Sequence, residues 1–167
     1  AALALGHAAG LSMETMLEVL RVFPGLPHRM QSVATIDGVD WVNDSKATNI
    51  GACIAALEGL PGRAVLIAGG DGKGADFKAL KPVVRERARA VVLFGKDAGL
   101  LYSILQSETK TLRVADLGQA VETSARLARP GDTVLLSPAC ASLDQFTDYQ
   151  ARGRFFEELV RGMMHAH

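Results

Sequence analysis

The stretch VDWVNDSKATN, residues 39–49, joins a strand-like run to an unusually polar loop and indicates the fold class. Residues 39–42 are mostly apolar, with two valines and a tryptophan. The following loop, residues 43–49, contains an acid, a cation, two hydroxyls and two amides. A loop that only reversed the chain would need glycine, proline or one Asx residue. Because ligands in open α/β sheets bind at the carboxyl ends of strands, we expect a binding site in this loop.

Outward from this stretch, the sequence predicts a hairpin before it and alternating strands and helices after it. Asp37-Gly38 separates two strand-like runs, 31–36 and 39–43, and is a strong hairpin signal. A helix over 13–22 is expected behind the capping residue Ser12. The later strands are expected at 64–68, 90–94, 111–114 and 133–136, and the later helices at 50–57, 77–87, 98–106, 117–127 and 145–164. Such alternation predicts an α/β fold with a mainly parallel sheet and helices on both faces, the hairpin lying at one end.

Length and composition restrict the functional classes. A chain of 167 residues is expected to form one domain and can bury roughly 70% of its unfolded surface. Its 18 basic and 18 acidic residues argue against a nucleic-acid binder, which usually has a basic excess. Cys53 and Cys140 lack metal-binding spacing, so we expect buried free thiols. No apolar run is long enough to cross a bilayer, and we expect a cytoplasmic protein without a membrane partner.

Two further strand-end loops carry unusual chemistry. In residues 69–74, GGDGKG, the glycines allow backbone amides to approach an anion, and Lys73 adds a positive charge. The loop matches neither a P-loop nor a dinucleotide fingerprint, and a simple glycine connector remains an alternative. In residues 137–144, SPACASLD, hydroxyls suit a polar pocket, although Asp144 is also a candidate cap for the last helix.

The cations of these loops suggest a class of ligand. Lys46 and Lys73 lie at strand ends, and Arg29 lies in a turn before the hairpin, where a solvated surface position is the alternative. Guanidinium and ammonium groups bind carboxylates and phosphates. The residues alone therefore predict a pocket for a small dianion, or for a phosphate plus a carboxylate.

Four motifs resemble a known family: LPHR at 26–29, NDSKATN at 43–49, GGDGK at 69–73 and SPACASLDQF at 137–146. In this order they resemble the C-terminal domain of the Mur ligases over essentially the whole chain. The resemblance implies one Rossmann-like domain, residues 1–167, of a cytoplasmic bacterial enzyme whose UDP-binding and ATPase domains are absent from this chain. It implies an ADP-forming ligase of peptidoglycan precursor synthesis, which adds D-glutamate to UDP-N-acetylmuramoyl-L-alanine through an acyl phosphate.

The resemblance also implies roles for individual residues. Arg29 and Asp44 match nucleotide-binding positions. The positions that match the D-glutamate site are Lys46, Thr48, Lys73, Ser142, Leu143 and Tyr149. Tyr149 stands where the best-known members carry phenylalanine. ATP and magnesium would be held mainly by the absent central domain, so the chain alone is expected to bind no metal and to be inactive. The alternative is a stand-alone binding module for a dicarboxylic or phosphorylated metabolite.

Overall fold

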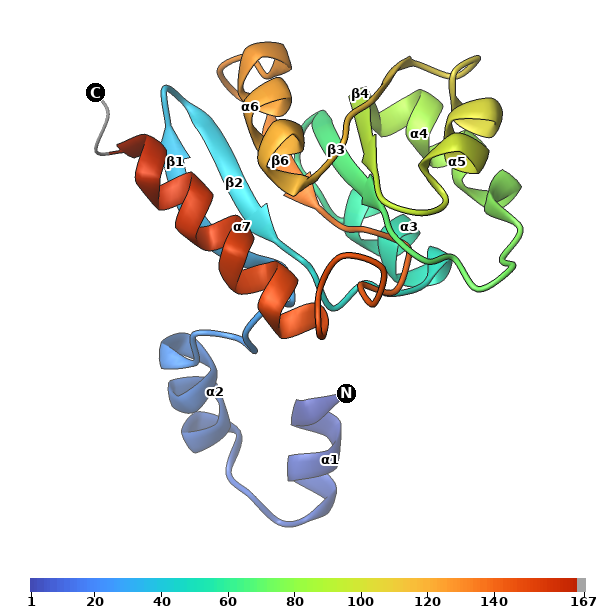
Figure 1. The fold of residues 1–167 in the computed structure, drawn as a ribbon. Helices are drawn as coiled ribbons and strands as arrows, with labels where there is room; N and C mark the ends of the chain where they lie inside the picture. Colours follow the sequence, from blue (N-terminus) through green and yellow to red (C-terminus); the bar gives the residue numbers. More distant parts are fainter. Residues whose placement is uncertain (165–167) are drawn as a thin grey trace.

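A six-stranded sheet forms the centre of the computed structural model, which describes residues 1–164 (Figure 1). The strands are β1 (Gln31–Ile36), β2 (Val39–Asn43), β3 (Ala64–Gly69), β4 (Ala88–Phe94), β5 (Lys110–Arg113) and β6 (Thr133–Leu136). Their order is β1-β2-β6-β3-β4-β5. Only β1 pairs antiparallel, with β2 at one edge, and the other pairs are parallel. The predicted sheet and the position of the hairpin are confirmed.

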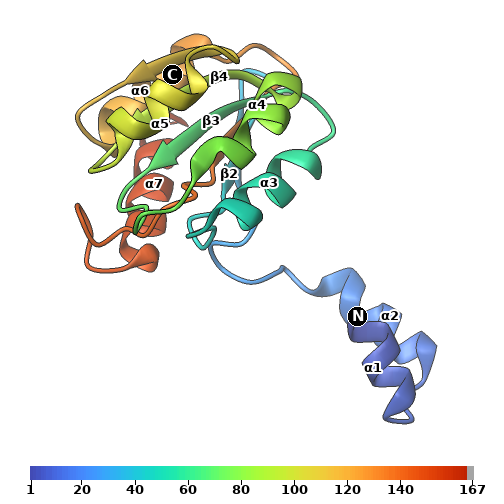
Figure 2. The same cartoon turned by 90° about the vertical axis from the view of Figure 1, so that its right-hand side faces the viewer.

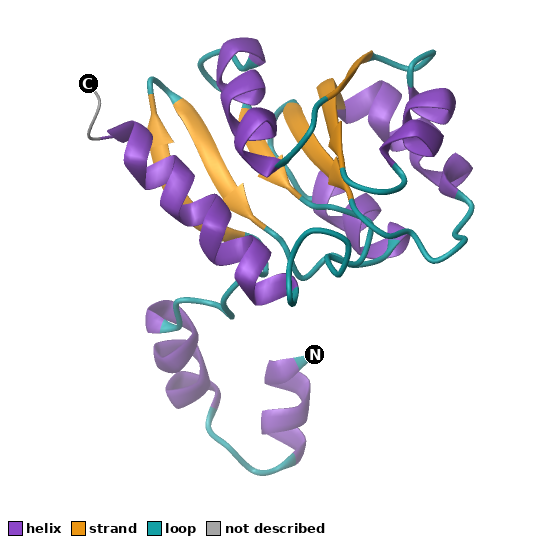
Figure 3. Cartoon of the chain, in the orientation of Figure 1, coloured by secondary structure: helices purple, strands orange, loops and turns teal. Residues whose placement is uncertain are grey.

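Helices cover both faces of the sheet (Figure 3). They are α1 (Ala2–Ala8), α2 (Met13–Val22), α3 (Ile50–Glu58), the 3₁₀ helix η1 (Phe77–Leu80), α4 (Lys81–Arg87), α5 (Ala98–Leu105), α6 (Leu117–Leu127) and α7 (Tyr149–Met164). Helices α3, η1, α4 and α5 bury apolar residues against one face, and α6 and α7 against the other. Strand β3 is buried along its whole length, as expected for a parallel strand covered on both sides.

Two predicted helices differ from the structure. The expected helix 77–87 begins as η1 and continues as α4, with Pro82 in the first turn of α4, where no amide donor is required. The last helix begins at Tyr149 instead of residue 145, because Asp148 is the residue that caps it by accepting the Ala151 amide at 2.6 Å. The alternative role of Asp144 as that cap is wrong. Its carboxylate accepts the amide of Lys96 at 2.8 Å.

Helices α1 and α2 lie beside each other, apart from the sheet, in both views (Figures 1 and 2). Ser12 accepts the Thr15 amide at 3.2 Å and caps α2 as predicted. Neither helix contains a buried residue, and Leu5 and Val22 are largely exposed. The core therefore lies within residues 28–164. Within the part of the chain that the structure describes, no helix combines the length and the apolar character needed to cross a membrane.

Candidate functional site

The loops that follow β2, β3 and β6 meet at the carboxyl edge of the parallel strands. The glycine loop after β3 pairs with the loop after β6, because Asp71 and Ala141 exchange two backbone hydrogen bonds of 3.0 and 2.9 Å. Gly70 allows this close approach, since a Cβ built there would lie 2.2 Å from the carbonyl oxygen of Ala141. Its φ of +125° also favours glycine. The pairing places Lys73 and Ser142 beside the same small cavity.

Arg152 of α7 connects the loop after β2 to the loop after β6 from inside the protein. Its side chain is fully buried, its Nε donates to the Ser45 hydroxyl at 3.0 Å, and Nη2 donates to the Ser45 carbonyl at 2.9 Å. Nη1 and Nη2 both donate to the Cys140 carbonyl at 3.2 Å. Burial lowers the pKa of this guanidinium to about 10, so it remains charged at neutral pH. The arginine therefore holds the loop after β2 and the loop after β6 in one arrangement.

A second buried network fixes the start of the loop after β2. The Asn43 side-chain nitrogen lies 2.9 Å from His28 Nδ1 and 2.7 Å from Glu157 Oε1. His28 has a left-handed backbone (φ +61°), and its carbonyl accepts the Lys46 amide at 3.0 Å. Gly153 gives the imidazole room, because a Cβ there would lie 2.3 Å from its ring. The turn that carries Arg29 is thereby attached to both the loop and α7.

The larger of the two cavities that border the loop after β2 has a volume of about 550 Å³. It contains both predicted nucleotide-binding residues, Arg29 and Asp44, together with Lys46, and small residues of α3 form a further wall. The Asp44 carboxylate accepts the Met30 amide at 3.2 Å and the Ser137 hydroxyl at 2.9 Å. Burial raises the pKa of this carboxyl, and these two hydrogen bonds oppose the shift. The cavity thus contains two cationic side chains, one carboxylate that hydrogen bonds hold in place, and an apolar wall.

The smaller cavity has a volume of about 180 Å³. It is lined by five of the six residues predicted for D-glutamate: Thr48, Lys73, Ser142, Leu143 and Tyr149. Asp148 and Ala141 complete the lining. Lys73 is exposed and has a left-handed backbone (φ +51°), which its amide stabilises by donating to Asp71 at 2.9 Å.

The sixth predicted residue, Lys46, lies between the two cavities. It lines the larger one, but its Nζ lies 4.0 Å from the centroid of the Tyr149 ring, which is a wall of the smaller one. An ammonium at this distance from an aromatic face is attracted by the ring quadrupole. The Ser45 hydroxyl donates to the Tyr149 carbonyl at 2.8 Å and holds the backbone of this tyrosine in place. One side chain is therefore available to ligands in both cavities.

Sequence reasoning missed Arg152 and Asp148. The signal for Arg152 was its position four residues before Phe156 and eight before Val160, on the buried side of α7. Asp148 was recognisable as an acid directly before a helix. The expected buried thiols are confirmed: burial raises the pKa of both Cys53 and Cys140 to about 12, which keeps them protonated.

Comparison with known proteins supports the motif analysis. The chain is 58% identical to UDP-N-acetylmuramoylalanine--D-glutamate ligase of Methylococcus capsulatus over 98% of this chain and 36% of that protein. It is 55% identical to the protein of the same name from Marinobacter nauticus, over 98% of this chain and 37% of that protein. The chain thus spans little more than a third of the length of these relatives.

Solved structures share the fold. UDP-N-acetylmuramate-alanine ligase MurC of Thermotoga maritima matches 96% of this chain and 36% of its own, with a TM-score of 0.67 and 16% identity. E. coli FolC, solved in complex with ADP, matches 98% of this chain and 39% of its own, with a TM-score of 0.68 and 19% identity. The sequence profile described as "Mur ligase, glutamate ligase domain" matches residues 28–140, which is more than half of the chain. The chain therefore belongs to the family of the Mur ligase, glutamate ligase domain.

Proposed function

We propose that this chain is the C-terminal, amino-acid-binding part of a cytoplasmic ATP-dependent ligase that adds D-glutamate to UDP-N-acetylmuramoyl-L-alanine. The observation that carries the proposal is the pair of adjacent cavities with Lys46 between them. The names of the relatives, which are D-glutamate ligases, support the choice of substrate. A ligase that uses ATP to activate a carboxylate for attack by an amino acid needs neighbouring nucleotide and amino-acid sites, because the amine must reach the acyl phosphate that ATP forms.

The smaller cavity is the proposed D-glutamate site. D-glutamate carries two carboxylates, and Lys73 and Lys46 are the cations next to this cavity. The hydroxyls of Thr48 and Ser142 are available as hydrogen-bond donors to the carboxylate oxygens. The Tyr149 ring and the Leu143 side chain would pack against the aliphatic part of the substrate. In the proposed reaction the substrate amine attacks an acyl phosphate, forms an amide and releases phosphate.

The larger cavity is the proposed contact with ATP. Arg29 and Lys46 carry the positive charge that phosphates require, and Asp44 is an acceptor for a ribose hydroxyl. Bound ATP would supply the phosphoryl group that activates the carboxylate. In residues 1–164 no three His, Cys, Asp or Glu side chains gather in a way that could hold a metal ion, so we derive no step through magnesium. Residues outside this chain would position the acceptor substrate and the metal.

Release of ADP by the longer protein that contains this domain tests the proposal. With UDP-N-acetylmuramoyl-L-alanine as acceptor, we expect ADP release with D-glutamate and none with L-glutamate, L-alanine or diaminopimelate. Use of a different amino acid would retain the ligase class and contradict the substrate. No release with any of them would contradict the function.

A pair of charge reversals tests the assignment of the smaller cavity. Lys73→Glu should abolish the use of D-glutamate without unfolding the protein, because the side chain is exposed in a glycine loop. Lys78→Glu is the matched control, since Lys78 is an exposed lysine of η1 outside both cavities. Equal activity of the two variants, with both folded by circular dichroism, would contradict the assignment.

A further inference from the structure

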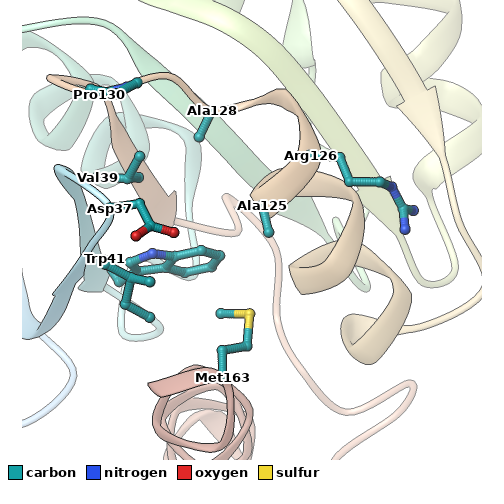
Figure 4. A pocket seen from close by; sticks show the side chains of 9 residues that line it. Asp37, Val39, Trp41, Ala125, Arg126, Ala128, Pro130 and Met163 are labelled. Carbon is teal, nitrogen blue, oxygen red and sulfur yellow. The ribbon is translucent and has the colours of Figure 1, made fainter. Parts of the chain in front are cut away.

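A cavity of about 460 Å³ lies at the other end of the sheet and has no role in the proposed ligase function (Figure 4). Strand β2 runs from this cavity, at Val39, to the candidate site, at Asn43. The turn between β1 and β2, the end of α6 and the last turn of α7 form its walls, with apolar surface from Ile36, Ala128 and Met163. Its volume lies within the roughly 300–1,000 Å³ typical of small-molecule sites.

One charged group faces this cavity without a partner. The Asp37 carboxylate is exposed, and within residues 1–164 no hydrogen bond or ion pair to it is formed. Its place is set by the hairpin turn, in which Asp37 and Gly38 both have positive φ values, +50° and +75°. Arg126 also lines the cavity, but it donates to the Thr123 hydroxyl at 3.3 Å and points away from Asp37 in Figure 4. The two charges of the lining therefore do not pair with each other.

Trp41 lines the same cavity and closes it on the side of the sheet (Figure 4). It is 2% exposed, and its indole N–H has no hydrogen-bond partner in the described part of the chain. This nitrogen has less than 1 Å² of accessible surface, so the ring lines the cavity with its apolar part. Within residues 1–164, the Asp37 carboxylate is thus the exposed charged group at this end of the cavity that lacks a partner.

We propose that this cavity binds a small organic cation, namely a protonated amine on an apolar body. The ammonium complements Asp37, and the apolar body contacts Met163 and Ile36. The site is independent of the proposed ligase reaction, because none of its residues lines either cavity at the carboxyl edge.

The protein carries its own reporter for this site, since Trp41 is the only tryptophan of the 167 residues. Tryptophan fluorescence of the chain would be titrated with L-phenylalaninol, an amino alcohol, and with 3-phenyl-1-propanol, which lacks the ammonium. We expect a saturable change with both, and roughly fivefold tighter binding of phenylalaninol, as for one partly solvated ion pair. Equal dissociation constants, or no saturable change with phenylalaninol, would overturn the proposal.

Two variants connect the preference to one carboxylate. Asp37→Asn should remove the preference for phenylalaninol and still fold, because asparagine also tolerates the left-handed backbone of this turn. Glu122→Gln removes an exposed carboxylate of α6 outside the cavity and should retain the preference. A preference that persists in the Asp37→Asn variant would overturn the assignment. None of these results depends on ligase activity, so the proposed cation site and the proposed ligase reaction are tested independently.

Discussion

Replacing Tyr149 by leucine tests whether its ring holds Lys46 between the two cavities. The ammonium lies 4.0 Å from the ring centroid, and both side chains are half-buried. A cation–π contact contributes about 0.5–1 kcal/mol at exposed sites and about 2 kcal/mol when desolvated, so we take about 1 kcal/mol for this pair. That free energy corresponds to a roughly fivefold change in an equilibrium constant. Tyr149→Phe retains the ring face and is the matched control.

Two measurements follow the effect of this replacement. In the 167-residue chain, the Lys46 side-chain protons next to Nζ should be shifted upfield by the ring current, and the shift should disappear only in the leucine variant. In the longer protein, the leucine variant should raise the KM for D-glutamate roughly fivefold, with little change in the KM for ATP. The KM for ATP should change little, because Lys46 still lines the larger cavity when it no longer contacts the ring.

Two results would refute this reasoning. An unchanged Lys46 proton shift in the leucine variant would show that the ammonium does not lie over the ring in solution. A phenylalanine variant as impaired as the leucine variant would show that the tyrosine hydroxyl matters instead of the ring face.

Three further predictions concern stability. Arg152→Lys should lower the free energy of unfolding by about 1–3 kcal/mol in urea denaturation, because buried carbonyls lose donors, and an unchanged midpoint would contradict the role of this guanidinium. Gly70→Ala should destabilise more than Gly74→Ala, because only the former places a Cβ 2.2 Å from a backbone oxygen; equal melting temperatures would show that the loop relaxes freely. The Lys81 ammonium and the Arg85 guanidinium lower the pKa of Glu108 to about 2. The contribution of this carboxylate to the free energy of unfolding is therefore complete above about pH 4.5 and is lost as the pH falls toward 2. Glu108→Gln should flatten the pH dependence of the urea midpoint in that window. An unchanged slope would show that Glu108 is not the source of this pH dependence.

Local sequence signals were reliable where a structural element depends on its own residues. Asp37-Gly38 specified a hairpin whose strands begin and end where expected, because both turn residues accept positive φ. Ser12 specified the start of α2, since a cap bonds an amide three residues away. The signal failed at Asp144, which resembles a cap but bonds Lys96, 48 residues earlier. Nothing local distinguishes these two uses of a carboxylate.

In the candidate site, too, local sequence motifs predicted the loops, and contacts between distant residues were not predictable. Four motifs were sufficient to identify its loops, and the smaller cavity collects five of the six residues predicted for it. The position of Lys46 was decided by a contact with a ring 103 residues later in the chain. The clamp formed by Arg152 also depends on two distant loops, so its role in holding the cavities was not visible from spacing.

By itself, the sequence determined the α/β class, the hairpin, the strand-end loops and the family, because hydrophobic period, turn chemistry and motif order are properties of neighbouring residues. Only the tertiary structure decided that two cavities border the loop after β2, that Lys46 lies between them and that Arg152 connects their walls. It also decided that Asp37 and Trp41 border a separate cavity at the far end of β2. The physical reason is that burial and hydrogen-bond partners are set by strand order and loop packing, which bring together residues far apart in the chain.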